Sequence, residues 1–178
     1  MFKQLVSSVK YLHEFKICHR DLKLTNVLVN EDSDIKLIDF GFSTIANRYF
    51  KTYCGTPSYM SPELVKKMEY DGIAVDLWAM GVILYKMVTG DYPFGSEKDK
   101  FLNERILACD LKMPNYVSLE CRNLIVSCLQ QDPQNRIKEW ICQGEAEGFR
   151  HTITSKLTCD GSNHEGGDGN KGECYVCF

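Results

Sequence analysis

The sequence lacks the features that mark several large classes of protein. It has no run of about 20 apolar residues, the length that a membrane-spanning helix needs, because its longest apolar stretch, residues 73–88, includes Asp76 and Lys86. No apolar segment of the kind found in secretory signal peptides follows Met1. The net charge of −3 gives no excess of the basic residues that nucleic-acid binding normally requires. We therefore expect neither a membrane nor a nucleic acid among its partners.

Cysteine is abundant by comparison, but its pattern does not fit a disulfide scaffold. The nine cysteines are odd in number and irregularly spaced, and no secretory signal accompanies them. This pattern favours a reducing, intracellular location, either cytoplasmic or nuclear. Cys18, Cys109, Cys121 and Cys128 have apolar neighbours, and we expect them to be small core residues.

The first third of the chain predicts a helix, a hairpin and a long loop. Apolar residues recur at helical spacing over residues 2–15. Residues 27–29 and 35–38 predict two short strands, and the turn-forming residues 30–34 between them predict a hairpin. Residues 39–60 show no period, and loops of this length are usually functional.

The middle of the chain predicts helices. Ser61 followed by Pro62 is typical of a helix start, with Ser61 as the N-cap. Residues 73–88 are apolar on nearly every face, which indicates a buried central helix that ends at Gly90. A further amphipathic helix is expected over residues 119–129. The fold class expected is mainly α, with one small hairpin.

Residues 138–178 differ in composition from the rest. The stretch 159–170 has almost no apolar residues, so it cannot bury enough surface to offset its conformational entropy, and we expect this tail to be disordered. Cys174 and Cys177 form a C-x-x-C pair that could supply two zinc ligands. The spacing to the other cysteines and histidines of the tail matches no common zinc module, so zinc binding is the weaker interpretation.

A motif at residues 19–26, His-Arg-Asp-Leu-Lys-Leu-Thr-Asn, lies between the first helix and the hairpin. Phosphoryl transfer needs a carboxylate beside the attacking hydroxyl, a cation on the phosphate and ligands for Mg²⁺. Asp21 can be the carboxylate, Lys23 the cation and Asn26 an oxygen ligand. The competing interpretation is that Asp21, together with Asp39 of the next motif, is a loop carboxylate that only caps a local turn.

A second motif, Asp39-Phe40-Gly41, follows the second predicted strand directly. Three residues alone recur by chance, but the order of this motif after residues 19–26 and the hairpin is specific. Together the two motifs resemble the H-R-D-L-x-x-x-N loop and the D-F-G motif of eukaryotic-type protein kinases.

Two further segments are similar to the same family. Residues 54–63, Cys-Gly-Thr-Pro-Ser-Tyr-Met-Ser-Pro-Glu, resemble the end of the kinase activation segment, with Ser61 where the family more often has Ala. Residues 76–81, Asp-Leu-Trp-Ala-Met-Gly, resemble the D-x-W-x-x-G of its central helix. The lysine that follows Asp-Leu, Lys23, resembles the residue that serine/threonine kinases have at this position. Residues 39–43 weakly resemble the calcium/calmodulin-dependent and AMP-activated kinases.

The resemblance implies a fold and a domain boundary. It covers residues 1–137, which would form a partial protein kinase domain, the C-terminal lobe, in the α+β class with an N-terminal lobe absent. It also implies transfer of the γ-phosphate of ATP, with Mg²⁺, to a Ser or Thr of a protein substrate.

Particular residues take roles by resemblance. Asp21 would orient the hydroxyl or accept its proton, and Lys23 would steady the phosphate. Asn26 and Asp39 would hold Mg²⁺, and Leu28 would form the floor under the adenine, although it could also be an ordinary core residue of the strand. These roles make the catalytic loop and the hairpin one nucleotide site.

A second set of residues would support this site. Thr56, counted with the catalytic residues, would hydrogen-bond to Asp21 and Lys23. The resemblance also implies structural roles for four residues. Glu63 and Arg136 would form a buried ion pair, and the Asp76 carboxylate would accept backbone hydrogen bonds from the catalytic loop. His19 is the fourth structural residue.

Regulation would involve Thr52 and Arg20. Thr52 lies two residues before Cys54, where many relatives are phosphorylated, and Arg20 precedes Asp21, as in kinases that bind such a phosphate. A phosphate on Thr52 could pair with Arg20 and order the loop. The alternative is an unmodified threonine that faces solvent.

The motifs that would complete a kinase are not found before His19. A glycine-rich loop, a strand lysine and its partner glutamate would all belong to the missing N-lobe. We therefore expect this chain alone to be inactive and to expose an apolar face where that lobe would dock. Two alternatives stay open: a non-catalytic lobe that acts as a binding or decoy module, and a kinase of small molecules.

Overall fold

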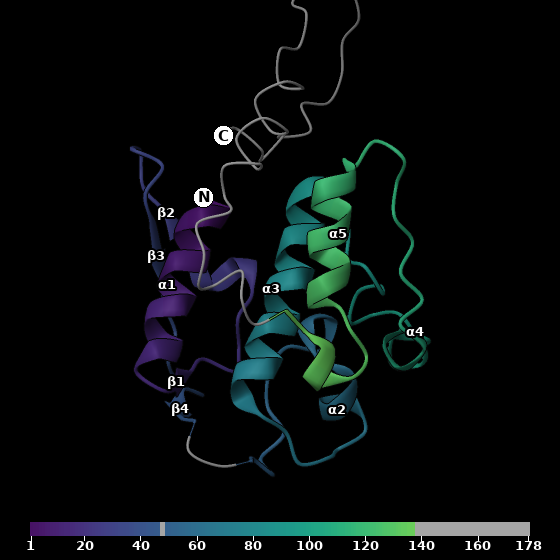
Figure 1. Cartoon of the computed structure of the whole chain (residues 1–178), viewed down its shortest axis with the longest axis horizontal. Helices are drawn as coiled ribbons and strands as arrows, with labels where there is room; N and C mark the ends of the chain where they lie inside the picture. Colours follow the sequence, from purple (N-terminus) through teal and green to yellow (C-terminus); the bar gives the residue numbers. More distant parts are fainter. Residues whose placement is uncertain (47–48, 138–178) are drawn as a thin grey trace, which may run out of the picture.

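A computed structural model describes residues 1–46 and 49–137 (Figure 1). The tail 138–178, for which we expected disorder and considered zinc, lies outside the described residues. The described part contains five α-helices, of which four surround a central one. They are α1 (Phe2–Glu14), α2 (Pro62–Val65), α3 (Gly72–Thr89), α4 (Leu102–Ala108) and α5 (Leu119–Cys128).

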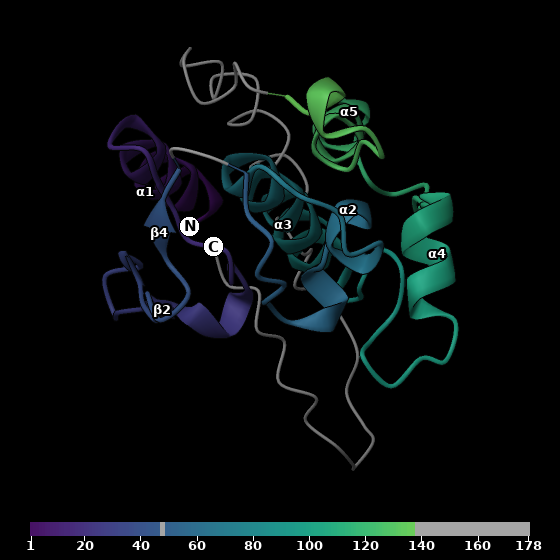
Figure 2. The same cartoon turned by 90° about the horizontal axis from the view of Figure 1, so that it is seen from below.

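The central helix is α3, which lies between α1 and α5 (Figures 1 and 2). Its N-terminus is capped by Asp71, whose carboxylate accepts a hydrogen bond from the backbone N–H of Ile73 at 2.9 Å. It ends at Gly90, which has the left-handed φ of 84° that glycine adopts readily. The expected start, apolar character and stop of this helix are thus present in the structure.

Close packing between α3 and α5 depends on Gly81. A Cβ atom at this position would lie 2.6 Å from the Cβ of Cys128, so any larger residue would push the two helices apart. Trp78 is fully buried on the same helix and stacks on Phe94 with 5.4 Å between ring centroids. The helix therefore forms the core against which the other elements are placed.

By length and composition alone, α3 could cross a membrane. Its mean hydropathy is 1.4, and 78% of it is buried inside the protein. A core helix passes the same test when its apolar surface is covered by neighbouring elements. Among the described residues it is the only helix that meets these criteria.

Two small antiparallel sheets flank α1. Strand β2 (Val27–Val29) pairs with β3 (Ile35–Leu37), with Val27 opposite Leu37. This is the predicted hairpin. The other sheet pairs β1 (Ile17–Cys18) with β4 (Thr44–Ile45). The sequence had suggested that residues 39–60 form one long loop. The segment is not wholly loop, because it contains β4 and the 3₁₀ turn Pro57–Tyr59.

Two local expectations need correction, and one alternative loses support. Ser61 occupies the N-cap position of α2, but its side chain makes no capping hydrogen bond, and its buried hydroxyl has no hydrogen-bond partner among residues 1–46 and 49–137. Cys109 is only half-buried, whereas Cys18, Cys121 and Cys128 are buried as expected. The exposure of Leu28, 50%, argues against the alternative that it is only a core residue of the strand.

Candidate active site

The Asp21 carboxylate is the centre of a compact polar cluster. Its Oδ1 accepts a hydrogen bond from Thr56 Oγ1 at 2.9 Å, and its Oδ2 accepts one from Lys23 Nζ at 2.7 Å. Lys23 Nζ also donates to Thr56 Oγ1 at 3.1 Å. Asp21 and Thr56 lie 35 residues apart in sequence. The structure therefore brings the end of the loop 39–60 onto the catalytic-loop motif.

Asn26 completes the cluster from the 3₁₀ turn before β2. Its amide nitrogen donates to the backbone carbonyl of Asp21 at 2.9 Å, and the side chain is almost fully buried. No hydrogen bond to its amide oxygen is present within residues 1–46 and 49–137. That oxygen is therefore left without a hydrogen-bond donor among the described residues.

The Asp76 carboxylate holds the backbone of the catalytic loop. It accepts hydrogen bonds from the N–H groups of His19 and Arg20, both at 2.8 Å, and from His13 Nε2 at 2.9 Å. Asp76 is 1% exposed, and a buried carboxylate is tolerated only when donors surround it. The central helix thus fixes the loop that carries Asp21.

Arg20 has a strained backbone that this carboxylate helps to hold. Its φ is 65°, in the left-handed region that non-glycine residues rarely occupy. The Arg20 side chain donates to the carbonyl of Phe42 at 2.7 Å and to the hydroxyl of Tyr70 at 3.1 Å. It also lies 4.9 Å from the centroid of the Phe50 ring. These contacts fix a conformation that costs on the order of 1–3 kcal/mol.

His19 connects the catalytic loop to the segment that contains Asp39. Its Nδ1 accepts a hydrogen bond from the N–H of Asp21, so Nε2 carries the proton that it donates to the carbonyl of Ile38 at 3.1 Å. The His19 ring also contacts the Phe40 ring, with 5.0 Å between centroids. The two motifs predicted to act together are therefore joined through one buried imidazole.

Asp39 lies two residues beyond β3 on an exposed turn. Its φ is 63°, and its Oδ1 accepts a weak hydrogen bond from the N–H of Gly41 at 3.4 Å. The Asp39 carboxylate makes no ion pair with any residue that the structure describes. It remains free to bind a cation.

The face beside Asp39 is apolar and exposed. Leu28, Val29, Phe40 and Phe42 are between 45% and 51% exposed. They come from β2 and from the segment after β3, near the hairpin; Leu28 and Val29, which are adjacent in β2, project from its two faces.

Glu63 and Arg136 form a buried ion pair behind the residue 54–63 segment. Arg136 Nη1 also donates to the carbonyl of Ala74 at 2.9 Å. The pair therefore joins α2 and the start of α3 to the 3₁₀ turn that follows α5. The expected partner of Glu63 is the residue found there.

Thr52 is exposed and does not contact Arg20 directly. Its carbonyl accepts a hydrogen bond from the hydroxyl of Tyr70 at 2.7 Å, and that hydroxyl in turn accepts one from Arg20. Burial raises the pKa of Tyr70 to about 12, with the positive charge of Arg20 opposing the shift. Tyr70 is therefore a neutral bridge between the two residues.

Sequence reasoning missed two residues of this network, His13 and Tyr70. His13 lies in an otherwise amphipathic helix, yet it is 7% exposed. A polar side chain on the apolar face of α1 was the available signal. Tyr70 lies outside every motif, and nothing in its neighbourhood indicated its role.

Comparisons with known proteins agree with this geometry. The family model of the protein kinase domain matches residues 1–145. Serine/threonine-protein kinase kin-29 of Caenorhabditis briggsae is 45% identical over 138 residues, which cover 76% of this chain and 17% of that protein. The probable serine/threonine-protein kinase MARK-A of Dictyostelium discoideum is 44% identical over 137 residues, which cover 76% of this chain and 13% of that protein. The chain thus spans less than a fifth of the length of either relative.

Proposed function

Because the chain belongs to the protein kinase family, we propose that it carries the phosphoryl-transfer residues of a serine/threonine protein kinase acting inside the cell, in the cytoplasm or the nucleus. The full reaction transfers the γ-phosphate of ATP to a Ser or Thr hydroxyl of a protein substrate. The observation that supports this most strongly is the hydrogen-bonded cluster of Asp21, Lys23 and Thr56.

In this proposal Asp21 receives the substrate hydroxyl. Its carboxylate is held by Lys23 and Thr56 and fixed through its backbone by Asn26, so little reorganisation is needed when the acceptor arrives. Lys23, which is partly exposed, can contact the transferred phosphate while staying beside Asp21. Thr56 links this pair to the segment 54–63, which would bind the protein substrate.

The residues present suit Mg²⁺ and ATP. The Asn26 amide oxygen and the Asp39 carboxylate are hard oxygen ligands of the kind that Mg²⁺ prefers. Among the described residues, the Asn26 oxygen accepts no hydrogen bond and the Asp39 carboxylate forms no ion pair. The metal, when bound, would neutralise charge on the phosphates. The exposed side chain of Leu28 would provide an apolar floor for the adenine ring.

Regulation by phosphorylation is part of the proposal. The backbone of exposed Thr52 is joined to Arg20 through the Tyr70 hydroxyl, so a phosphate on Thr52 would be introduced near Arg20. The Arg20 guanidinium could then exchange its neutral partners for a charged one, which makes a stronger hydrogen bond. This would tighten the segment between β4 and α2.

We propose that residues 1–137 form the C-terminal lobe of the kinase and that activity requires a second lobe. A glycine-rich loop and a lysine–glutamate pair over the ATP phosphates would come from that lobe. The exposed apolar surface at Leu28, Val29, Phe40 and Phe42 supports this docking. The chain alone would then lack activity and could act as a binding or decoy module.

The test compares Asp21→Asn with the unaltered protein, expressed with any sequence that flanks this chain in its native message. Transfer of labelled phosphate from ATP to a mixture of proteins and to peptides containing Ser or Thr is measured. We expect Asp21→Asn to lower kcat by about 10²–10⁴-fold, the range for loss of a general base. Thr56→Ala should lower it less, and Thr56→Ser should restore it.

Glu69→Gln, at an exposed position outside the cluster, serves as the control and should leave the rate unchanged. Equal activity of the Asp21→Asn and unaltered proteins would refute the assignment of Asp21. Transfer to small molecules but to no protein would favour a small-molecule kinase. Binding of protein partners without any transfer would favour the non-catalytic alternative.

A further inference from the structure

Lys86 is a half-buried cation without a carboxylate partner. It lies in the last turn of α3, and its Nζ is 3.6 Å from the centroid of the Tyr92 ring. Within residues 1–46 and 49–137, no carboxylate is within ion-pair distance of it. The ring covers one side of the ammonium group, so donors on its other side remain open to an anion.

Two aromatic rings connect Lys86 to the candidate active site. Tyr92 meets Tyr59 edge to face, with 5.5 Å between centroids and an interplanar angle of 88°. The Tyr59 hydroxyl accepts a hydrogen bond from the N–H of Leu24, the residue after Lys23, at 3.4 Å. Tyr59 also ends the 3₁₀ turn that follows Thr56. Lys86 therefore lies beside the segment that faces the protein substrate in the proposed reaction.

The tyrosines do not supply the missing negative charge. Burial raises the pKa of Tyr59, and the charge of nearby Asp21 contributes to the same shift, so the phenol stays neutral at physiological pH. Neither ring therefore gives Lys86 an anionic partner, and none of the described carboxylates forms an ion pair with it.

We propose that Lys86, held against Tyr92, is a specificity-determining residue that favours protein substrates with an anionic side chain a few residues from the acceptor hydroxyl. An extended peptide rises about 3.3 Å per residue, so a segment with its acceptor at Asp21 reaches the Tyr59–Tyr92 pair within a few residues. The ligand chemistry is a carboxylate or a phosphorylated side chain. This inference rests on the proposed kinase function.

The experiment measures kcat/KM for a set of peptides with one fixed Ser or Thr acceptor. Each position within about four residues of the acceptor, roughly the reach of the extended segment, is occupied in turn by Ala, Glu, phosphoserine or Arg. The enzyme is the protein expressed with its native flanking sequence. It is compared with Lys86→Met, which keeps an apolar stem against Tyr92, and with Lys86→Glu, which reverses the charge.

At one or more positions, the unaltered protein should prefer Glu over Ala by roughly three- to fivefold, the range of a partly solvated ion pair. Lys86→Met should abolish this preference while leaving the Ala peptide unchanged, and Lys86→Glu should favour Arg. A larger preference for phosphoserine than for Glu would identify a phosphorylated side chain as the ligand. Both results support the assignment.

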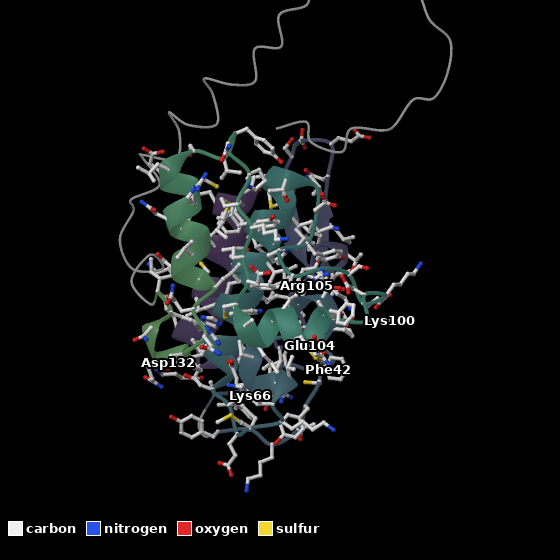
Figure 3. All side chains as sticks on the ribbon, turned by 90° about the vertical axis from the view of Figure 1, so that its right-hand side faces the viewer. Phe42, Lys66, Lys100, Glu104, Arg105 and Asp132 are labelled. Carbon is white, nitrogen blue, oxygen red and sulfur yellow. The ribbon has the colours of Figure 1, made fainter. Side chains whose placement is uncertain are left out.

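Lys66→Met is the matched control. Lys66 is an exposed lysine at the end of α2 (Figure 3), and α2 packs near the start of α3 through Leu64 and Val75, away from the last turn. It should keep the preference for Glu. An equal rate for Glu and Ala peptides at every position, or the same preference in Lys86→Met, would overturn the inference while leaving kinase activity intact. Absence of transfer even to the Ala peptides would instead refute the proposed function.

Discussion

Arg136 donates two parallel hydrogen bonds to Glu63, from Nη1 to Oε1 over 2.6 Å and from Nη2 to Oε2 over 2.7 Å. The two residues are 73 positions apart, and they are only 2% and 6% exposed. Such a bidentate pair balances two charges that could not be buried separately. It joins the segment before α3 to the end of the last described helix.

Loss of one partner of this pair should strongly destabilise the protein. Arg136→Met leaves the Glu63 carboxylate buried without its cation, and we expect the free energy of unfolding to fall by about 3–5 kcal/mol. Denaturation in urea, followed by circular dichroism, measures the change. The double variant Glu63→Met/Arg136→Met removes both charges and should recover much of the loss.

The control for this prediction is a second ion pair, between Lys51 and Glu69. Its charged atoms lie 2.8 Å apart, and both side chains are exposed. Because solvent screens exposed charges, Lys51→Met should leave the unfolding curve essentially unchanged. If Arg136→Met and Lys51→Met behaved alike, the Glu63–Arg136 pair would have no special structural role.

Asp76→Asn should reduce activity without removing any residue that touches substrate. Oδ2 accepts from His19 and His13, and Oδ1 accepts from Arg20, so an amide NH₂ group in place of either oxygen loses at least one of these hydrogen bonds to the loop backbone. The catalytic loop would shift, and a displacement of about 1 Å can cost about 10²-fold in rate. The expected result is a lower kcat for peptide phosphorylation at nearly unchanged peptide KM.

Two substitutions of His13, which donates to the same Asp76 carboxylate, should reduce activity to different extents. His13→Gln keeps a side-chain donor toward Asp76, whereas His13→Phe removes it, so the first should retain more activity than the second. The melting temperature of each variant is measured alongside the rate. A normal kcat in Asp76→Asn would contradict the role of Asp76 in positioning the loop.

Buried thiols should make the protein less stable at alkaline pH. Burial raises the pKa of Cys18 and Cys121 from 9.0 to about 11, and that of Cys128 to about 12. Between pH 9 and these values the unfolded chain loses protons that the folded protein keeps. The unfolded state then binds fewer protons, so the free energy of unfolding decreases as pH rises.

The measurement is the melting temperature from pH 8 to pH 11. It should be nearly constant up to about pH 9, the ordinary pKa range of the thiol, and fall above it. Cys121→Ala removes one titrating group and should lessen the fall relative to the unaltered protein. An identical slope in both proteins would show that Cys121 does not contribute.

The sequence allowed prediction of the elements whose signals are local. The start and end of α3 were predicted from its continuous apolar run and from Gly90, and the hairpin from two apolar runs around a turn. Strands β1 and β4 are only two residues long, too short to show a period. Helix α4 has seven residues and buries only Leu102 and Ile106, so its pattern was too short to recognise.

The candidate site divides in the same way. Asp21, Lys23 and Asn26 lie within six residues and could be predicted as one motif. The contact of Thr56 with them was inferred from family resemblance, because it spans the loop. The roles of His13 and Tyr70 depend on packing between distant segments, which no local pattern in a single sequence encodes.

The apolar surface next to the candidate nucleotide site yields the last prediction. Leu28 and Val29 are 50% and 51% exposed, although both lie in a strand. Burial of apolar area is favourable by about 25 cal/mol per Å², so this surface should be covered by a second lobe or by another copy of the chain. Expressed alone, the chain should therefore self-associate, as measured by light scattering after gel filtration.

Val29→Lys should reduce this association because it places a charge within the apolar surface. Phe101→Ser is the matched control, since Phe101 is 56% exposed but lies at the start of α4, away from the hairpin. It should leave the association unchanged. A monodisperse monomer for the unaltered chain, with a cooperative melting transition, would show that this surface needs no partner, and the case for a docked second lobe would lose its structural support.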